Sequence, residues 1–480
     1  MIPSNLEPQR VFYFFNMINQ IPRPSGKEEK MADFLVNFAK ERGLFVYRDK
    51  VNNVIIRKPA AKGLEHVPSV VLQGHQDMVC EKNPDVSINF ETDAIQTEYV
   101  DGYIKAKGTT LGGDDGIGVA MALAILDDSS LRLGQIEALF TIDEERGLMG
   151  AKNVEAGILQ SKLMINLDSE TEGQIFMGCA GGQDLAAYFD TEFEPVPKNS
   201  LQLEISITHL HGGHSGDDIE KGFGNANQIL SKFLQQAKDK YGLRLCSFTG
   251  GNLRNAIPRD ATAVCCIPFE YREQIRIDFN IYSAEMQQEY KKDENARYVM
   301  QSTTAASMLS QRVSNNVIDC LANMFNGVLC FSKDCPGLVE TSSNLASVRT
   351  GKERICIVTS QRSLIYKDIF KMTDRIADTF QQYGAAVERS GDYPGWTPNP
   401  SSFLLKRAQE IHVQLFGKPI EARAIHAGLE CGLFTTKYPD MDIISIGPNV
   451  KDIHSPAESL EVASVERVFR HVLAILTSLV

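Results

Sequence analysis

The sequence predicts an α/β fold in which a domain with a mixed, mostly parallel sheet is interrupted by an inserted α+β domain. Short apolar runs at 69–72, 136–141 and 163–167 alternate with segments of helical spacing, which is the pattern of strands joined by helices. Two polar stretches that contain Pro, at 190–200 and 390–396, mark the ends of the insertion. Ligands of such a sheet bind beyond the carboxyl ends of its strands, so the residues at those ends carry the functional argument.

Two helices are expected before the first strand. Residues 9–20 show helical apolar spacing, and the order Ser25-Gly26-Lys27-Glu28 is typical of a capping box that opens a second helix, which ends at Gly43. The next elements are a strand at 69–72, a short apolar helix at 120–126, and strands at 136–141 and 163–167.

The chain is expected to return to its first domain after the insertion. We assign residues 1–189 and 391–480 to the sheet domain and residues 190–390 to the inserted domain. The last segment contains a helix at about 402–415, a strand at 442–447 and a terminal helix from about Ala463. His454 lies in this segment, so its cluster can join the earlier ones only if the segment rejoins the sheet domain.

Composition narrows the classes of partner. The 480 residues, 43% apolar and 23% charged, predict a globular protein of two or three domains. A net charge of −12, without a Lys/Arg run, argues against nucleic acid or an anionic membrane as partner, and small molecules are expected instead. The first residues lack a basic and apolar leader, and no window is apolar enough to span a bilayer, which predicts a cytosolic protein. Ten Cys without paired spacing predict reduced thiols, with Cys265 and Cys266 on opposite faces of a strand.

Five acid-and-histidine clusters follow apolar runs or stand in Gly-rich bends. They are His75-Gln76-Asp77, Asp114-Asp115, Glu144-Glu145, Asp168 and His454. Buried carboxylates and imidazoles are costly unless they are paired or bound to metal, so a common partner is expected. Two His and three or four carboxylates, with no Cys, predict two divalent cations per chain, with zinc favoured and manganese or cobalt as alternatives.

Spacing suggests a role for each residue of these clusters. Two adjacent metal ions need one shared carboxylate, for which we expect Asp114, with Asp115 as a helix cap or as the alternative bridge. The remaining metal ligands are expected to be His75, Glu145, Asp168 and His454. Asp77 follows His75 by two residues on an extended segment and is expected to orient its imidazole. Glu144 stays uncommitted to metal and is expected to act as the general base.

Longer strings around these residues resemble those of the co-catalytic zinc exopeptidases and, within that clan, of the aminoacyl-histidine dipeptidases. The strings are Gly74–Val79, Gly108–Gly118, Asp143–Gly147, Asn166–Glu170 and Asp452–Pro456. The similarity runs nearly end to end and also covers Gly212–Gly216, Asn252–Pro258 and His426–Gly432. Five motifs in the same order are a strong signal, whereas any one of them alone would be weak.

The resemblance implies a zinc-exopeptidase-like catalytic domain interrupted by a lid domain. It implies hydrolysis of unblocked dipeptides of the Xaa-His or β-alanyl-histidine type and of broader dipeptides, by a water that two metal ions activate. It also implies that His75 and Asp168 serve one ion while Glu145 and His454 serve the other. A small peptide is then the expected partner, and the formation of a homodimer is left open.

The resemblance further implies which residues bind the substrate. In the lid, His214 matches a histidine that approaches the substrate carbonyl, and Arg254 and Asn255 match residues that hold the substrate carboxylate. None of these three has an evident local partner in the sequence. A preference for a free amino group requires an acceptor for the ammonium, for which Glu430 is the candidate.

Two other functions use the same residues. An N-acyl-amino-acid deacylase would employ the same metal core, and a non-catalytic binding protein would share the fold. The complete set of ligands and Glu144 argue against the binding protein. Cleavage of a dipeptide compared with that of its N-acetyl derivative separates the two enzymes.

Overall fold

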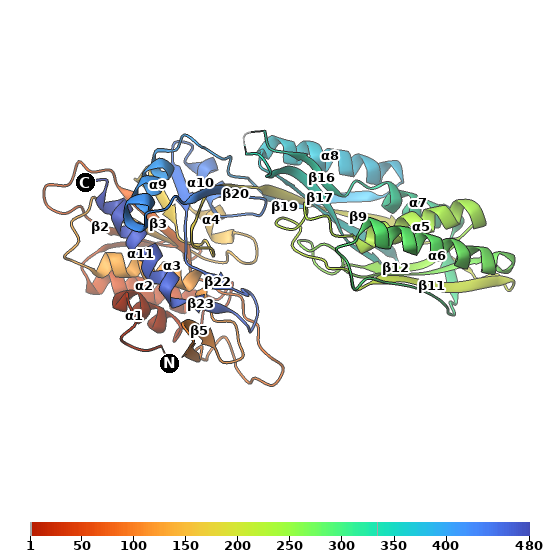
Figure 1. Cartoon of the computed structure of the whole chain (residues 1–480), viewed down its shortest axis with the longest axis horizontal. Helices are drawn as coiled ribbons and strands as arrows, with labels where there is room; N and C mark the ends of the chain where they lie inside the picture. Colours follow the sequence, from red (N-terminus) through yellow and green to blue (C-terminus); the bar gives the residue numbers. More distant parts are fainter. Residues whose placement is uncertain (1, 334) are drawn as a thin grey trace. The chain divides into compact units, whose positions relative to one another are not determined.

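The computed structural model describes residues 2–333 and 335–480 and divides the chain into two compact units (Figure 1). Unit 1 comprises Met1–Gly178, Trp396–Ala424 and Glu430–Val480, and unit 2 comprises Cys179–Gly395 and Ile425–Leu429. The boundaries expected from the sequence, 190 and 390, fall at the end of strand β9 (Gly181–Asp190) and within strand β19 (Ala386–Tyr393). These two strands pair with each other, so unit 2 begins before the first of them and ends after the second.

Unit 1 contains seven helices and twelve strands among its described residues. The helices are α1 (Gln9–Ile18), α2 (Glu29–Glu41), α3 (Gly113–Asp127), α4 (Met149–Asn153), α9 (Phe403–Phe416), α10 (Cys431–Lys437) and α11 (Val462–Thr477). The strands are β1 (Phe45–Arg48), β2 (Val54–Lys58), β3 (Val70–His75), β4 (Thr97–Val100), β5 (Tyr103–Ala106), β6 (Ile136–Thr141), β7 (Leu163–Asn166), β8 (Gln174–Cys179), β20 (Glu421–Ile425), β21 (Asp442–Ser445), β22 (Val450–Lys451) and β23 (Ser459–Glu461).

The main sheet of unit 1 is mixed, with a parallel centre. Its strand order is β1-β2-β6-β3-β7-β21-β8-β20, in which β6, β3, β7 and β21 run parallel and β1, β2 and β8 are antiparallel to their neighbours. Every residue of β3 and β6 is buried, as expected for central strands that helices cover on both faces. A smaller sheet has the order β22-β23-β5-β4.

The N-terminus of α9 is capped by a nearby side chain, whereas that of α2 is not. Ser402 caps α9 by accepting the N–H of Leu405, as its position predicts. The capping box expected at Ser25 is wrong, because α2 begins at Glu29 without a side-chain cap. The carboxylate of Glu28 instead accepts N–H groups of Gly26 and of Asp143, and the second of these lies far away in sequence.

Unit 2 consists of two sheets and the helices that pack on the larger one. Its strands are β9, β10 (Phe193–Pro195), β11 (Ser200–Thr208), β12 (Arg244–Gly250), β13 (Ala261–Pro268), β14 (Arg297–Ser302), β15 (Ser307–Leu309), β16 (Gly327–Phe331), β17 (Val339–Thr350), β18 (Arg354–Ser363) and β19. Its helices are α5 (Ala226–Tyr241), α6 (Arg272–Glu289), α7 (Gln311–Asn323), α8 (Tyr366–Gln382) and a 3₁₀ turn at Phe269–Tyr271.

The larger sheet of unit 2 is antiparallel and carries its core on one face. The order is β14-β11-β13-β12-β17-β18-β9-β19, with β16 paired to β17. Helices α5 to α8 contribute to a single apolar cluster with alternate residues of these strands. Cys265 belongs to this cluster, whereas Cys266 packs in a small cluster with Cys246, so the two neighbours face opposite sides of β13.

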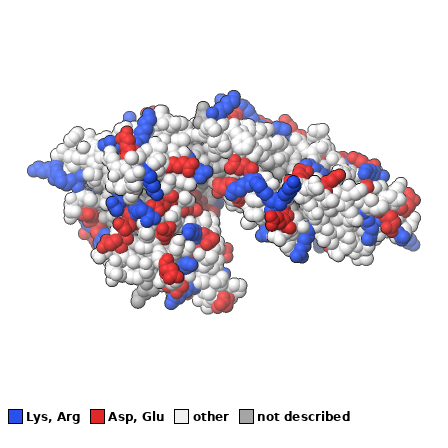
Figure 2. Space-filling model, in the orientation of Figure 1, with Lys and Arg blue, Asp and Glu red and all other residues white. Residues whose placement is uncertain are grey.

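Charged side chains are mixed on the surface. Figure 2 shows basic and acidic residues interspersed over the visible face of each unit. Among the helices of the described residues, none combines the length and the apolar character that crossing a bilayer requires.

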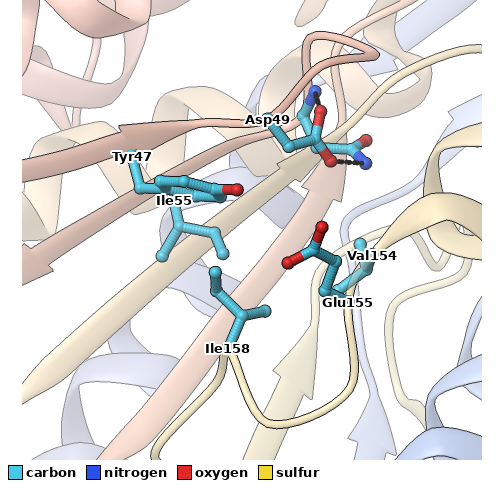
Figure 3. A pocket seen from close by; sticks show the side chains of 7 residues that line it. Tyr47, Asp49, Ile55, Val154, Glu155 and Ile158 are labelled. Atoms are coloured by element: carbon cyan, nitrogen blue, oxygen red, sulfur yellow. Dashed lines mark hydrogen bonds between the residues drawn. The ribbon is translucent and has the colours of Figure 1, made fainter.

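A small recess in unit 1 lies beside the segment that links β1 to β2 (Figure 3). Asp49 on its rim accepts the N–H groups of Val51 and Asn53 and the side-chain amide of Asn53. The amide of Asn53 in turn accepts the N–H of Ile142 and donates to the carbonyl of Gly150. Asn53 therefore holds together both ends of the loop that carries Glu144 and Glu145.

Candidate metal centre

The parallel strands deliver the predicted residues to one edge of the sheet. His75 is the last residue of β3, Glu144 and Glu145 stand in the loop after β6, and Asp168 follows β7 by two residues. Because β3, β6 and β7 are parallel neighbours, their carboxyl ends meet at the same edge. Asp114 at the start of α3 and His454 between β22 and β23 complete the group.

Asp114 lies between two imidazole rings. Its Oδ1 is 3.0 Å from Nε2 of His75, and its Oδ2 is 3.3 Å from Nε2 of His454. Asp168 approaches the first ring at 3.3 Å, and Glu145 approaches the second at 3.0 Å. The five side chains therefore form two pairs, His75 with Asp168 and His454 with Glu145, joined by one carboxylate.

Asp77 is fully buried behind this group. Its Oδ1 lies 3.3 Å from Nδ1 of His75, on the far side of the ring from Asp114. Its two carboxylate oxygens also accept the backbone N–H groups of Glu144 at 3.1 Å and of Glu145 at 3.4 Å. Asp77 thus connects the end of β3 to the loop after β6.

The carboxylate of Asp115 binds backbone N–H groups. Its Oδ1 accepts the N–H of Gly118 at 3.2 Å, in the manner of a helix cap, and its Oδ2 accepts the N–H of His75 at 3.3 Å. A Cβ at Gly74 or Gly118 would lie 2.2 Å from this carboxylate. Both glycines are therefore needed for the buried carboxylate to fit.

The ionisation of these groups reflects crowding of negative charge. Burial alone would lower the pKa of His75, but the neighbouring Asp168, Asp114 and Asp77 raise it well above its ordinary value. Hydrogen bonds that its ring donates to the carboxylates of Asp114 and Glu145 raise the pKa of His454 to about 10. Both rings are thus held in a strongly anionic environment.

Three further carboxyl groups have pKa values that burial raises. Burial raises the pKa of Glu144 well above its ordinary value, that of Glu170 to about 9 and that of Glu430 to about 7. Sequence reasoning passed over Glu170, although it follows Asp168 by two residues in the loop after β7. The nearby charges of Asp114 and Asp168 contribute to its shift.

The donor set fits divalent cations. Among residues 2–333 and 335–480, the ion pairs of Asp114, Glu145 and Asp168 are made with His only, so no Lys or Arg neutralises them. His75, Asp114 and Glu145 each offer a ligand atom within 4.8 Å of the others. Imidazole nitrogens with carboxylate oxygens suit zinc, manganese or cobalt, and a cation would compensate the surplus negative charge.

The predicted lid residues lie in unit 2, where His214 and Asn255 are close together. The N–H of Ser215 donates to the carbonyl of Asn255, and His214 forms an isolated bridge with Ala256. The half-buried ring of His214 accepts from backbone N–H groups through its Nδ1. The segments 214–215 and 255–256 are therefore aligned by their main chains.

Arg254 has no partner nearby in the sequence, as expected, but it pairs with a residue 70 positions away in the chain. Its Nη1 lies 2.7 Å from Oδ2 of Asp184 on β9. Arg362 on β18 behaves differently, because its buried guanidinium donates to the hydroxyl of Tyr393 and makes no ion pair with any described residue. Sequence reasoning missed Arg362, a basic residue in the buried second half of β18.

Glu430 lies in unit 1 and is fully buried. Its Oε2 accepts the side-chain amide of Gln73 at 2.6 Å and the hydroxyl of Thr141 at 2.7 Å. Its Oε1 has no partner among the described residues. Glu430 thus connects β3 and β6 to the start of α10.

Comparisons with known proteins agree with this geometry. The model of peptidase family M20/M25/M40 matches residues 71–478. The chain is 40% identical over 465 residues to the cytosol non-specific dipeptidase of Escherichia coli strain K12, which covers 96% of each protein.

Solved structures give the same result for the fold. The aminoacylhistidine dipeptidase of Vibrio alginolyticus superposes with a TM-score of 0.89 at 38% identity, over 99% of this chain and 97% of that one. An aminopeptidase from Bacillus cereus shares the fold at 17% identity, with a TM-score of 0.58 over 99% of each chain. The resemblance inferred from the five motifs, the α/β class and the insertion of a second unit into the first are confirmed. The chain belongs to peptidase family M20/M25/M40.

Proposed function

We propose that this chain is a metallo-dipeptidase that hydrolyses unblocked dipeptides, including those of the Xaa-His and β-alanyl-histidine type. One observation carries the proposal: the two oxygens of Asp114 face two separate pairs of His and carboxylate. That arrangement suits two adjacent divalent cations with Asp114 as the shared ligand. The similarity over nearly the whole chain to two proteins that are named dipeptidases supports the same function.

The remaining residues of the centre supply positioning and proton transfer. When bound, the cations polarise the peptide carbonyl and make a water more acidic. Glu144 takes the proton of the attacking water and passes it to the leaving amine, since its carboxylate stands beside the candidate ligand Glu145 and makes no hydrogen bond to a described residue. Asp77 fixes the ring of His75 through Nδ1.

Recognition of the free amino group requires a carboxylate close to the metal ligands. Glu430 was favoured by the sequence, but its hydrogen bonds to Gln73 and Thr141 give it a structural task. Glu170 is half-buried and follows the candidate ligand Asp168 by two residues in the loop after β7, so we assign the substrate ammonium to Glu170. Glu170→Gln should then raise KM for a dipeptide more than Glu430→Gln does.

Recognition of the substrate carboxylate is assigned to unit 2. Arg254 is neutralised by Asp184, whereas the guanidinium of Arg362 is buried without a described acidic partner. A buried, unpaired guanidinium is a favourable site for a carboxylate. We assign this role to Arg362, together with Asn255, and we assign contact with the substrate carbonyl to His214.

The test combines metal content with substrate choice. Protein treated with chelator and then reconstituted should hold about two ions of zinc, manganese or cobalt per chain, and His75→Ala or Asp168→Ala should lower that number. The reconstituted protein should cleave a dipeptide and leave its N-acetyl derivative intact. Preferential cleavage of the acetylated compound would identify a deacylase. If neither compound were cleaved, the proposed hydrolase activity would be contradicted.

A further inference from the structure

Glu458 is a buried residue that binds the bend carrying Asp114. Its Oε2 accepts the N–H groups of Leu111 at 2.7 Å and Gly112 at 3.1 Å, and its Oε1 accepts those of Gly113 at 2.7 Å and Asp114 at 3.4 Å. One carboxylate thus receives four consecutive backbone N–H groups. Such a row of N–H groups forms a concavity suited to an anion.

The position of Glu458 in the chain links this bend to a second candidate ligand. Glu458 follows His454 by four residues, and its own N–H donates to the carbonyl of Ser455. The segment that presents His454 is therefore anchored, through one side chain, to the segment that presents Asp114.

Arg23 holds the same bend from the opposite side. Its guanidinium is fully buried and donates to the carbonyl of Gly112 at 2.6 Å, and also to those of Gln76 at 3.1 Å and Asp77 at 2.7 Å. The backbone carbonyl of Arg23 accepts the N–H of Met78 at 3.1 Å. Arg23 thus connects the bend to the segment that follows His75.

Glu458 and Arg23 both bind the backbone of Gly112. Its N–H points to Glu458 and its carbonyl accepts from Arg23. Its φ of 69° lies in the left-handed region, and a Cβ would stand 2.3 Å from Nη2 of Arg23. The bend therefore has the conformation that only glycine adopts readily, with no room for a side chain.

We propose that Glu458 and Arg23 are positioning residues that hold the segments of His75, Asp114 and His454 in register for metal binding. The inference rests on the proposed function for the identity of the ligands. Both side chains bind backbone N–H or carbonyl groups of this chain. Positioning the ligands beforehand lowers the cost of ordering them when the ions bind.

Hydrogen exchange of the wild type gives a test that needs no variant. In full-length, chelator-treated protein, the amides of Leu111, Gly112, Gly113 and Asp114 should exchange slowly, because they donate to a buried carboxylate. Exchange at the rate of an unstructured loop would overturn the proposal. The Glu458→Gln variant should exchange these amides faster, since an amide offers one oxygen in place of two.

Metal affinity is the second readout. Glu458→Gln should bind zinc about 10–100-fold more weakly than the wild type, which is the scale seen when partners of ligands are changed. Excess zinc should restore most of its kcat, because both carboxylate oxygens of Glu458 are engaged by backbone N–H groups. Glu458→Asp keeps the charge and should fall between the two, and it serves as the test if the Gln variant does not fold.

Glu137 offers a matched control. It is a buried Glu that also accepts consecutive backbone N–H groups, of Gln160 at 2.9 Å and Ser161 at 2.8 Å, and pairs with Arg57. It stands near the start of β6, at the opposite end of the strand from the candidate centre. Glu137→Gln should lose stability and keep its zinc affinity.

The outcomes separate the two proposals. Equal zinc affinity in folded Glu458→Gln and wild type would overturn the positioning role and leave the dipeptidase intact. Full metal content in His75→Ala and Asp168→Ala would instead overturn the proposed ligands, while the exchange rates of the four amides would still decide whether Glu458 holds the bend.

Discussion

Replacing Asp77 by Asn separates its two tasks in the candidate centre. The carboxylate is fully buried, accepts the N–H groups of Glu144 and Glu145, and lies 3.3 Å from Nδ1 of His75. Asn has the same shape but keeps only one oxygen and presents an NH₂ group in place of the other. One hydrogen bond to a charged acceptor is lost, which should lower the free energy of unfolding by about 1.5–3 kcal/mol.

The effect on metal binding should be separate and measurable. An Asn fixes the ring of His75 less strongly, so affinity for zinc should fall about 10–100-fold, equivalent to about 1.4–2.8 kcal/mol. Competition with a chromophoric chelator measures this affinity, and urea unfolding measures stability. Asp293→Asn is the control, because Asp293 is also buried and accepts two backbone N–H groups, of His211 and Gly224, but lies in unit 2.

Asp293→Asn should lose stability without any change in zinc affinity. If Asp77→Asn lost stability and kept zinc affinity within about twofold of the wild type, well below the expected effect, Asp77 would be only an acceptor for the backbone. The reasoning that it orients His75 would then be refuted.

Three other predictions follow from the same geometry. Glu144→Gln should keep about two metal ions while kcat falls by at least about 10²-fold, and near-normal turnover would move proton transfer elsewhere. Arg362→Ala should raise KM for dipeptides more than Arg254→Ala does. The reverse order would mean that Arg254 holds the substrate carboxylate, as the sequence suggested. His214→Ala should mainly lower kcat and should retain the metals. Burial lowers the pKa of His471 to about 4, below about 6.5 in the unfolded chain, so the unfolded chain binds the proton more tightly. Stability should therefore fall as pH drops from about 6.5 to 4, by at most about 1.4 kcal/mol per pH unit, and His471→Gln should flatten that part of the urea-unfolding profile.

The sequence predicted the framework of unit 1 where patterns were local. The strand at 136–141 was found with the same bounds because an unbroken apolar run between polar turns has few other solutions. The five clusters came together because they stand at the ends of neighbouring parallel strands or in the bends beside them. Their roles in metal binding and catalysis stay predictions.

The features that sequence reasoning missed depend on partners far away in the chain. Glu458 and Arg23 bind backbone N–H and carbonyl groups, which every residue type offers, so no side-chain pattern marks the partner. Arg254 is neutralised by Asp184 on another strand, and Glu28 is drawn to the N–H of Asp143 rather than to a local cap. Such choices are made by tertiary structure.

The place of β21 in the sheet has a consequence for biosynthesis. This strand, Asp442–Ser445, lies between β7 and β8, although both of those strands come before unit 2 in the chain. At about 5–20 residues per second, a ribosome needs on the order of tens of seconds to add unit 2 before β21 emerges. During that time the nascent sheet has an open edge at β7, and His454 has not yet been made. Unit 2 can fold in this interval, but the metal centre can close only near the end of translation.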